Sequence, residues 1–202
     1  MEKGFVYLDE VVPYVCWKAM YATSDNFTGA PVDGYGADRI VGTDELAAAL
    51  KSAAFLAHKE GLGLFLWDAY RPQRAVNNFI EWSRQPEDFS TKERHYPNVN
   101  REDMFDLGYI AKRSGHSRGS TIDLTLYRLD TMELLDMGGI FDFMDERSHH
   151  GAEGIGETAA QNREKLRSIM LACGFTDYSN EWWHYRLKNE PYPDTYFDFP
   201  IL

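Results

Sequence analysis

The chain has 202 residues, of which 44% are hydrophobic and 14% aromatic, so we expect one globular domain over residues 1–202 with a sizeable core. Its formal net charge of −11 at pH 7 disfavours nucleic-acid and anionic-membrane partners, because both are bound through basic surfaces. No apolar run reaches membrane-spanning length, and the N-terminus, with Glu2 and Asp9, lacks the basic start of a signal peptide. Together with two cysteines far apart in sequence, Cys16 and Cys173, these features predict a cytoplasmic protein.

Hydrophobic spacing and turn residues predict an irregular series of helices and strands. Thr43 can cap a helix in which leucines and alanines recur at helical spacing, and Pro72 suits the first turn of another. In chain order we expect a strand over 5–8, a loop over 24–36, a helix over 44–60, a strand over 62–67, a helix over 72–82, an irregular stretch over 85–100, a short helix over 101–107, a strand over 121–127, a helix over 158–173 and a strand over 182–187. This order predicts an α+β domain with a central antiparallel sheet flanked by helices.

Two motifs carry side chains suited to a metal site, SGHSRGSTID at 114–123 and EWWH at 181–184. A one-zinc hydrolase site needs three imidazole or carboxylate ligands, a fourth position open to water and a nearby carboxylate that handles protons. The candidates are three ligands and one base: His116, Asp123 and His184 as ligands, and Glu181 as the base.

The spacing of these residues alone is a weak signal. The alternative is that His116 and His184 are ordinary hydrogen-bonded histidines and that Asp123 caps a turn. In favour of a metal site, Gly115 and Gly119 allow a tight turn that brings His116 back alongside Asp123. The predicted strands would also hold Asp123 and His184 with the rigidity that a metal requires.

Two further side chains have both a structural and a catalytic interpretation. Glu181 is by default a solvated charge, but Trp182 and Trp183 lower the local dielectric and raise the pKa of its carboxyl, so that it can take a proton from zinc-bound water. Arg71 either forms a structural ion pair with Asp68 at a strand end or stabilises the oxyanion of a tetrahedral intermediate.

The remaining polar candidates are weaker. Asp142 is either a loop cap or the partner of a substrate ammonium. His149 and His150 are adjacent and point apart, which favours a surface or interface role, and His58 and His95 have no partner pattern. A serine nucleophile is disfavoured, because the chain has no G-x-S-x-G motif.

At these residues the sequence closely resembles the zinc-dependent D-alanyl-D-alanine dipeptidases of the VanX type, which are related to lysostaphin and hedgehog domains. The resemblance runs nearly end to end. It rests on several motifs in order: 25–29 (DNFTG), 67–72 (WDAYRP), 114–123, 124–130, 141–150, 181–184 and 196–200.

The resemblance implies one Zn²⁺ per chain, held by His116, Asp123 and His184, with Glu181 as the catalytic base and acid and Arg71 steadying the transition state. It further implies that Asp142 meets the substrate ammonium. The other residues that it places at the substrate are Ser114, Gly115, Tyr21, Tyr35 and Asp68.

The chain departs from the family at two positions near the site. The family pattern S-x-H-x-x-G-x-A-x-D has Ala where this chain has Thr121, and Gly115 stands where these dipeptidases have Ser. Neither change removes a ligand, so we expect zinc chemistry to survive while affinity or substrate range changes.

The activity that the resemblance implies is hydrolysis of D-Ala-D-Ala to two D-alanines, by zinc-bound water that Glu181 activates. The cellular role is then glycopeptide resistance, as against vancomycin, or ordinary D-Ala-D-Ala turnover. One rival is a peptidoglycan endolysin or carboxypeptidase, for which no export signal or wall-binding module is visible. The other is a hedgehog-like zinc-binding module without catalysis, which would not need both Glu181 and Arg71. The sequence leaves a homo-oligomer open.

Overall fold

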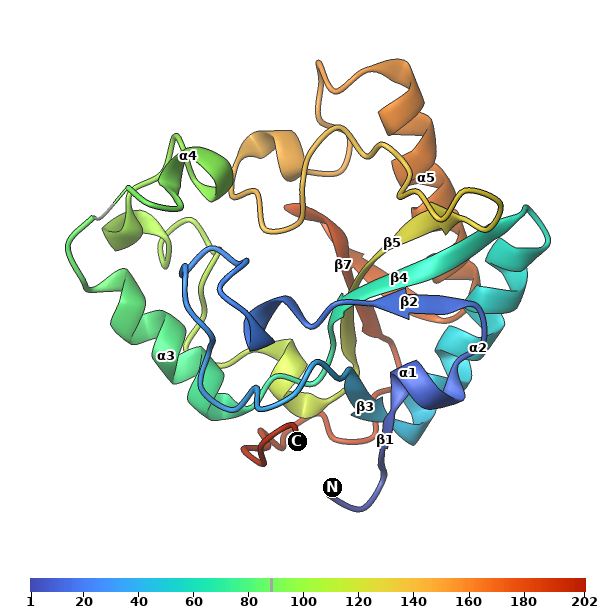
Figure 1. Cartoon of the computed structure of the whole chain (residues 1–202), viewed down its shortest axis with the longest axis horizontal. Coiled ribbons are helices and arrows are strands. Elements are labelled where there is room, and N and C mark those ends of the chain that lie inside the picture. Colours follow the sequence, from blue (N-terminus) through green and yellow to red (C-terminus); the bar gives the residue numbers. More distant parts are fainter. Residues whose placement is uncertain (88) are drawn as a thin grey trace.

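A mixed five-stranded sheet forms the centre of the protein in the computed structural model, which describes residues 1–87 and 89–202 (Figure 1). Its strand order is β2-β4-β5-β7-β6. The bounds of these strands are β2 Val15–Trp17, β4 Leu62–Asp68, β5 Thr121–Arg128, β6 Phe175–Tyr178 and β7 Glu181–Leu187. A separate antiparallel pair joins β1, Phe5–Tyr7, to β3, Val41–Thr43.

Two long helices pack against each other and against the sheet (Figure 1). The first, α2 (Asp44–His58), begins where the hydroxyl of Thr43 accepts a hydrogen bond from the Leu46 amide at 3.2 Å, which confirms the predicted cap. The second, α5 (Glu157–Ala172), contacts β6 and β7. The other helices are α1 Leu8–Val11, α3 Gln73–Ser83 and α4 Lys92–His95, with 3₁₀ turns at Met20–Ala22, Arg101–Asp103, Gly115–Arg118 and Glu146–Ser148.

The α+β class is confirmed, and the sheet expected to be antiparallel is mixed, because β2 pairs in parallel with β4 at one edge. A parallel neighbour needs a long crossover, and the chain between β2 and β4 supplies one that includes α2. Strand β2 escaped prediction because three residues give no readable alternation. The other three pairings in the sheet, β4 with β5, β5 with β7 and β6 with β7, are antiparallel.

The register of the central strands places three polar residues in one row. Asp123 on β5 is paired with His184 on β7 and, on its other side, with Asp68 at the end of β4. A bulge between Leu66 and Asp68 interrupts the β4–β5 ladder just before that pairing. Because side chains alternate along a strand, Ile122 and its neighbours in the core face away from the row.

The predicted helices and strands agree with the structure to within one or two residues, with one exception. The helix expected over 101–107 is reduced to the turn Arg101–Asp103, because a segment this short cannot stabilise a helix and Gly108, with φ of 82°, leaves the helical region. The stretch 85–100, expected to be irregular, contains the single turn α4, and position 88 within it lies outside the described residues.

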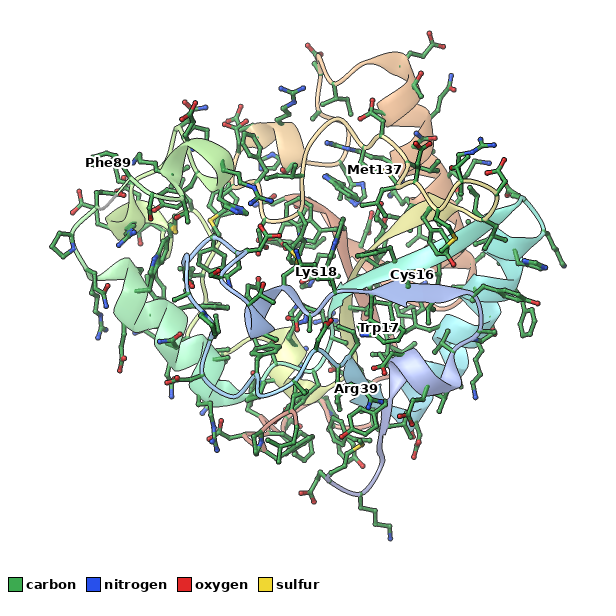
Figure 2. All side chains as sticks on the ribbon, viewed as in Figure 1. Cys16, Trp17, Lys18, Arg39, Phe89 and Met137 are labelled. Carbon is green, nitrogen blue, oxygen red and sulfur yellow. The ribbon has the colours of Figure 1, made fainter. Side chains whose placement is uncertain are left out.

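Both cysteines are free thiols, as their separation in sequence predicted. Cys16 lies on the edge strand β2 beside Trp17 (Figure 2), and Cys173 follows α5. In the part of the chain that the structure describes, no helix has the length and apolarity needed to cross a bilayer.

Candidate active site

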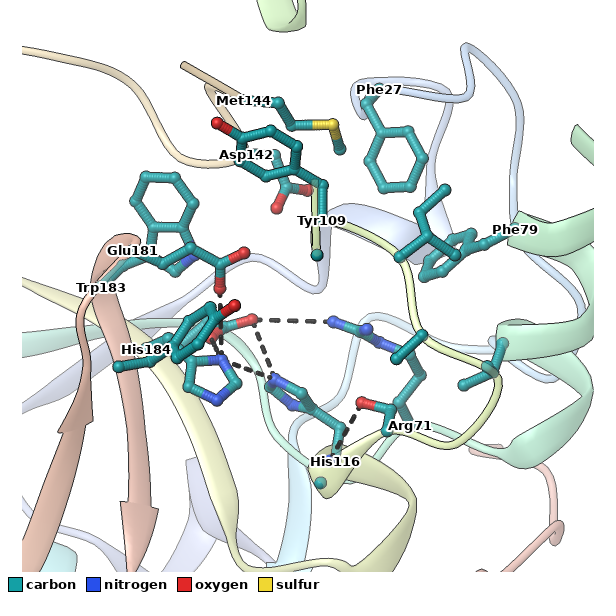
Figure 3. A pocket seen from close by; sticks show the side chains of 18 of the residues that line it. Phe27, Arg71, Phe79, Tyr109, His116, Asp142, Met144, Glu181, Trp183 and His184 are labelled. Carbon is teal, nitrogen blue, oxygen red and sulfur yellow. Dashed lines mark hydrogen bonds and ion pairs between the residues drawn. The ribbon is translucent and has the colours of Figure 1, made fainter. Parts of the chain in front are cut away.

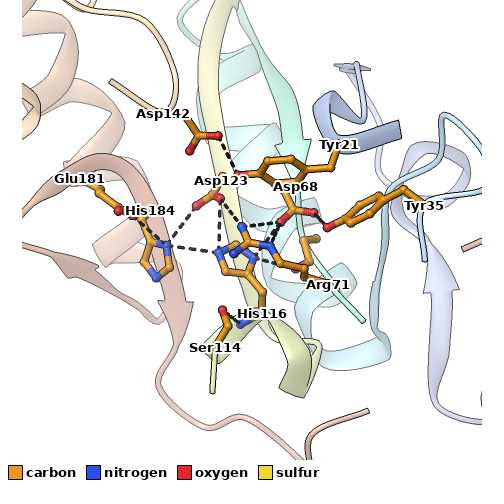
Figure 4. Close-up of polar contacts among 11 residues, drawn as sticks. Tyr21, Tyr35, Asp68, Arg71, Ser114, His116, Asp123, Asp142, Glu181 and His184 are labelled. Carbon is orange, nitrogen blue, oxygen red and sulfur yellow. Dashed lines mark hydrogen bonds and ion pairs between the residues drawn. The ribbon is translucent and has the colours of Figure 1, made fainter. Parts of the chain in front are cut away.

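Three side chains from β5, β7 and the Gly115–Arg118 turn converge on one point (Figure 4). One ligand atom from each of His116, Asp123 and His184 lies within 4.8 Å of the others. His116 Nε2 is 3.3 Å from Asp123 Oδ2 and 3.3 Å from His184 Nδ1, and His184 Nδ1 is 3.1 Å from Asp123 Oδ1. The turn that delivers His116 ends at Gly119, which has φ of 83° and sits against the ring of Phe5, so that no larger residue fits there.

The hydrogen bonds around these three residues fit a metal ion. His116 donates from Nδ1 to the carbonyl of Ala69 at 2.7 Å, which leaves the lone pair of Nε2 directed at the cluster. Asp123 Oδ1 is buried and has no hydrogen-bond partner among residues 1–87 and 89–202, despite the nearby His184 nitrogen. Two imidazoles and a carboxylate are a donor set that zinc prefers, so these residues would hold it.

Charge coupling within the group is strong. Burial alone would raise the pKa of Asp123, but the adjacent imidazoles of His116 and His184 hold it well below its usual value. Burial would lower the pKa of His184, yet the carboxylates of Asp123 and Glu181 raise it. The cluster therefore keeps Asp123 ionised, as a metal ligand must be.

Glu181 stands beside the three ligands at the start of β7. Its Oε2 atom lies 3.4 Å from His184 Nδ1, and the carboxylate faces the pocket (Figure 3). Burial raises its pKa to about 7, an effect that the charge of Asp123 reinforces and those of His184 and Arg71 oppose. A carboxyl that exchanges its proton near neutral pH suits a general base that later acts as an acid.

Arg71 forms the ion pair with Asp68 that its sequence position suggested, and it also lies near the metal-binding group. Its Nε and Nη2 atoms lie 2.9 Å and 2.8 Å from Asp68 Oδ2, and Nη2 is 3.7 Å from Asp123 Oδ2. Asp68 is buried, and its other oxygen accepts a hydrogen bond from Tyr35 Oη at 2.6 Å. The two-point contact with Asp68 fixes the plane of the guanidinium.

Of the residues expected at the substrate, Tyr35 and Asp68 lie behind Arg71, whereas others line the pocket itself. Among the described residues, those around the pocket include Tyr21, Ser114 and Asp142 but not Tyr35 or Asp68. Ser114 also orients the ligand turn, because its Oγ accepts a hydrogen bond from the amide of His116 at 3.2 Å.

Asp142 faces the pocket from a loop that joins β5 to α5. Tyr21 Oη donates to its Oδ2 at 2.7 Å, and the backbone carbonyl of Asp142 is 3.1 Å from Nδ1 of the buried His95. The residue adopts a left-handed conformation with φ of 54°. Burial raises the pKa of Asp142, opposed by the hydrogen bond from Tyr21. Among residues 1–87 and 89–202, no Lys, Arg or His forms a salt bridge with this carboxylate.

Aromatic side chains wall the pocket, which has a volume of about 240 Å³ (Figure 3). The sequence pointed to a ring-lined pocket but not to its members, which come from α3, from the sheet and from loops. The rings are those of Phe27, Phe79, Tyr109, Tyr178 and Trp183, and the thioether of Met144 lies among them. The ring of Tyr178 meets that of His184 edge-on at 5.6 Å, and burial raises the pKa of Tyr109 to about 12.

Two other histidines, His58 and His150, lie outside the pocket lining. His58 is exposed and stacks on Tyr14 at 3.9 Å. His150 lies edge-on to the ring of Tyr185 at 6.3 Å, and burial lowers its pKa.

A His-Asp-His group with an adjacent glutamate and a fixed arginine, in a small pocket on a sheet, defines a zinc-dependent hydrolase. Residues 1–202 match the model of the peptidase M15 family, described as "D-ala-D-ala dipeptidase", and the chain belongs to this family. It is 63% identical over 201 residues to a D-alanyl-D-alanine dipeptidase of Enterococcus faecium and 62% identical to one of Streptomyces coelicolor, in each case over the full length of both chains. A solved structure of a mutant vancomycin resistance D,D-pentapeptidase, VanY, in complex with Zn(II) aligns with a TM-score of 0.43 and 16% identity over 78% of each chain.

Proposed function

We propose that residues 1–202 act as a single zinc D,D-dipeptidase domain that hydrolyses D-Ala-D-Ala to two D-alanines. The observation that carries this proposal is a pocket of about 240 Å³ whose lining includes Asp142 and the three candidate zinc ligands, His116, Asp123 and His184. A pocket of this size can take a dipeptide. The relatives named D-alanyl-D-alanine dipeptidases, 62–63% identical along the whole chain, support the same substrate.

In this proposal Asp142 binds the ammonium group of the substrate. Its carboxylate is buried and only partly satisfied by Tyr21, so an incoming ammonium supplies the charge that it lacks. Tyr21 and Ser114 complete the contacts on either side of the scissile peptide. Because the loop bearing Asp142 is held through its carbonyl by His95, the carboxylate has a fixed position.

Zinc bound by His116, Asp123 and His184 would supply Lewis acidity to the peptide carbonyl and to an attacking water. Glu181 takes the proton of that water on its carboxylate and returns it to the nitrogen of the leaving D-alanine. The position of its Oε2 atom, 3.4 Å from His184 Nδ1, puts the carboxylate at the edge of the metal cluster.

Arg71 stabilises the negative charge that develops on the carbonyl oxygen. Asp68 holds the guanidinium of Arg71 at two points, and Tyr35 holds Asp68. The arginine therefore needs to move little when the negative charge develops. The aromatic walls exclude water and strengthen this electrostatic effect.

The test measures free D-alanine released from D-Ala-D-Ala by zinc-loaded protein, with and without a chelator. Parallel reactions contain L-Ala-L-Ala, a pentapeptide ending in D-Ala-D-Ala, and D-Ala-D-lactate. Chelator-sensitive cleavage of the D,D-dipeptide alone supports the proposal, and cleavage of the pentapeptide identifies a carboxypeptidase instead. Absence of cleavage by protein with one zinc per chain would refute catalysis and leave a binding role.

We further propose that the enzyme works in the cytoplasm on this free dipeptide, without nucleic-acid or membrane partners, which its two free thiols and net charge of −11 support. It would remove D-Ala-D-Ala either in glycopeptide resistance or in ordinary turnover. Vancomycin sensitivity of cells that express active protein or a Glu181→Gln variant separates the two roles. The sequence leaves open whether the chain forms a homo-oligomer, and light scattering would decide this by measuring its mass in solution.

A further inference from the structure

Residues 196–200 form one of the motifs that carry the sequence resemblance, yet none of them is among the residues that line the pocket. Figure 1 shows this last part of the chain, drawn in red, beside the start of α3. Arg71 stands two positions before α3 begins, in the loop that leaves β4. The segment therefore reaches the part of the chain that carries the arginine of the active site.

The segment supplies the hydrogen-bond partners that the first turn of α3 lacks. The first backbone amides of a helix have no partner within it, and Pro72, at the N-cap, offers no side-chain acceptor. The amide of Gln73 donates instead to the carbonyl of Phe197 at 3.0 Å. The amide of Arg74 donates to Asp198 Oδ1 at 2.7 Å. Asp198 thus caps α3 from a distant part of the chain, and its negative charge suits the positive end of the helix dipole.

The same segment holds the residue on the other side of Arg71. Tyr70 Oη donates to the carbonyl of Phe199 at 2.9 Å, and the two rings stack with their centroids 4.2 Å apart. Contacts with residues 197–199 therefore fix the chain one position before Arg71 and again two and three positions after it.

Phe197 also ties this loop to the turn that carries His116. Its amide donates to the carbonyl of Ser117 at 2.9 Å. The amide of Arg71 donates directly to the carbonyl of His116 at 3.3 Å. The loop with the guanidinium and the turn with the metal-binding imidazole are thus held together, and this sets how far Arg71 Nη2 lies from Asp123 Oδ2, at 3.7 Å.

We propose that Asp198 is a positioning residue: by capping α3 it fixes the backbone at Arg71 and so keeps the guanidinium where the oxyanion forms. The inference rests on the proposed dipeptidase function. Asp198 does not line the pocket and its side chain is about half exposed, so its replacement neither touches the substrate nor opens the core. A charged group must be in place before the reaction to stabilise the transition state, and a misplacement of about 1 Å can cost about 10²-fold in rate.

The test measures kcat and KM for D-Ala-D-Ala in zinc-loaded Asp198→Ala. We expect kcat to fall about tenfold with KM and zinc content unchanged, because Arg71 acts on the transition state. Arg74→Ala is the matched control. It removes the exposed ion pair with Asp198 but keeps the backbone amide that Asp198 caps, so its kcat should stay within about twofold of the wild-type value.

A double-mutant cycle with Arg71→Ala separates positioning from a general loss of stability. If Asp198 acts through Arg71, adding Asp198→Ala to Arg71→Ala should lower kcat by less than about twofold. An equal fall in both backgrounds, or an Asp198→Ala enzyme as active as wild type, would overturn the inference, as would an Arg74→Ala enzyme as impaired as Asp198→Ala. Wild-type protein that does not cleave D-Ala-D-Ala refutes the proposed function itself, whereas a cleaving wild type with any of these three results refutes only the positioning role.

Discussion

Replacement of Asp142 by asparagine should make the protein more stable and the enzyme worse. The amide is nearly isosteric with the carboxylate, its oxygen can still accept the hydrogen bond from Tyr21 Oη at 2.7 Å, and asparagine tolerates the left-handed backbone with φ of 54°. The substitution therefore removes a buried negative charge and little else.

The stability effect follows from the raised pKa of Asp142, which burial causes. A carboxyl whose pKa is higher in the folded than in the unfolded chain stabilises the fold fully below the unfolded pKa of about 4, and this contribution is lost as pH rises through the folded pKa. Each unit of pKa difference corresponds to about 1.4 kcal/mol. We therefore expect Asp142→Asn to raise the free energy of unfolding by at least about 1 kcal/mol at neutral pH, or the Tm by about 3 °C.

The kinetic effect has the opposite sign. Loss of one partner of a buried charge pair costs about 2–5 kcal/mol, so kcat/KM for D-Ala-D-Ala should fall by a factor of roughly 30 to several thousand. We would measure kinetics on zinc-loaded protein, and unfolding on metal-free protein from pH 5 to 8, because a nearby cation would itself lower the pKa of Asp142.

The gain in stability over wild type should grow with pH across that range. A variant that is less stable than wild type at pH 8, or a gain that does not depend on pH, would refute the electrostatic reasoning.

Four other substitutions test separate parts of the site and of the surface. Glu181→Gln should keep one zinc per chain and lose about 10²- to 10⁴-fold in kcat, whereas His116→Ala should lose the metal itself. Metal analysis and turnover measured on the same protein check both variants. A near-normal kcat of Glu181→Gln would exclude Glu181 as the base. Asp68→Asn removes the negative charge that pairs with Arg71 and so holds the guanidinium less firmly. We expect kcat to fall about 10- to 100-fold with zinc content unchanged, and an unchanged kcat would mean that Arg71 does not need this charge. Lys165→Ala breaks an exposed ion pair with Glu60 and should change the free energy of unfolding in urea by less than about 0.5 kcal/mol; a larger change would show that the pair matters.

The elements that were predictable from the sequence are those with a local signal. The cap at Thr43 and the repeated alanines define α2, and the apolar run of β4 ends where its polar residues begin. Strand β2 could not be predicted, because its three residues belong to the sheet only through parallel partners 49 positions away (Val15 with Leu64), a pairing that no local pattern records.

The residues of the site also differ in how far the sequence could predict them. The ligand residues stand in two compact motifs, and the sequence resemblance covered both. The roles of Tyr35 and Asp68 behind Arg71 depend on how separate loops fold together, as does the placement of Tyr109 and Met144 in the pocket wall.

The row formed by Asp68, Asp123 and His184 has a consequence for folding. Side chains alternate between the two faces of a sheet, so a slip of one residue between β5 and β7 would turn Asp123 or His184 away from the other. A chain with such mispaired strands has no complete set of ligands, and zinc would bind it far more weakly than the native form. By mass action the metal then favours the correctly paired sheet over its misregistered competitors, and acts as a check on folding before it takes part in any reaction.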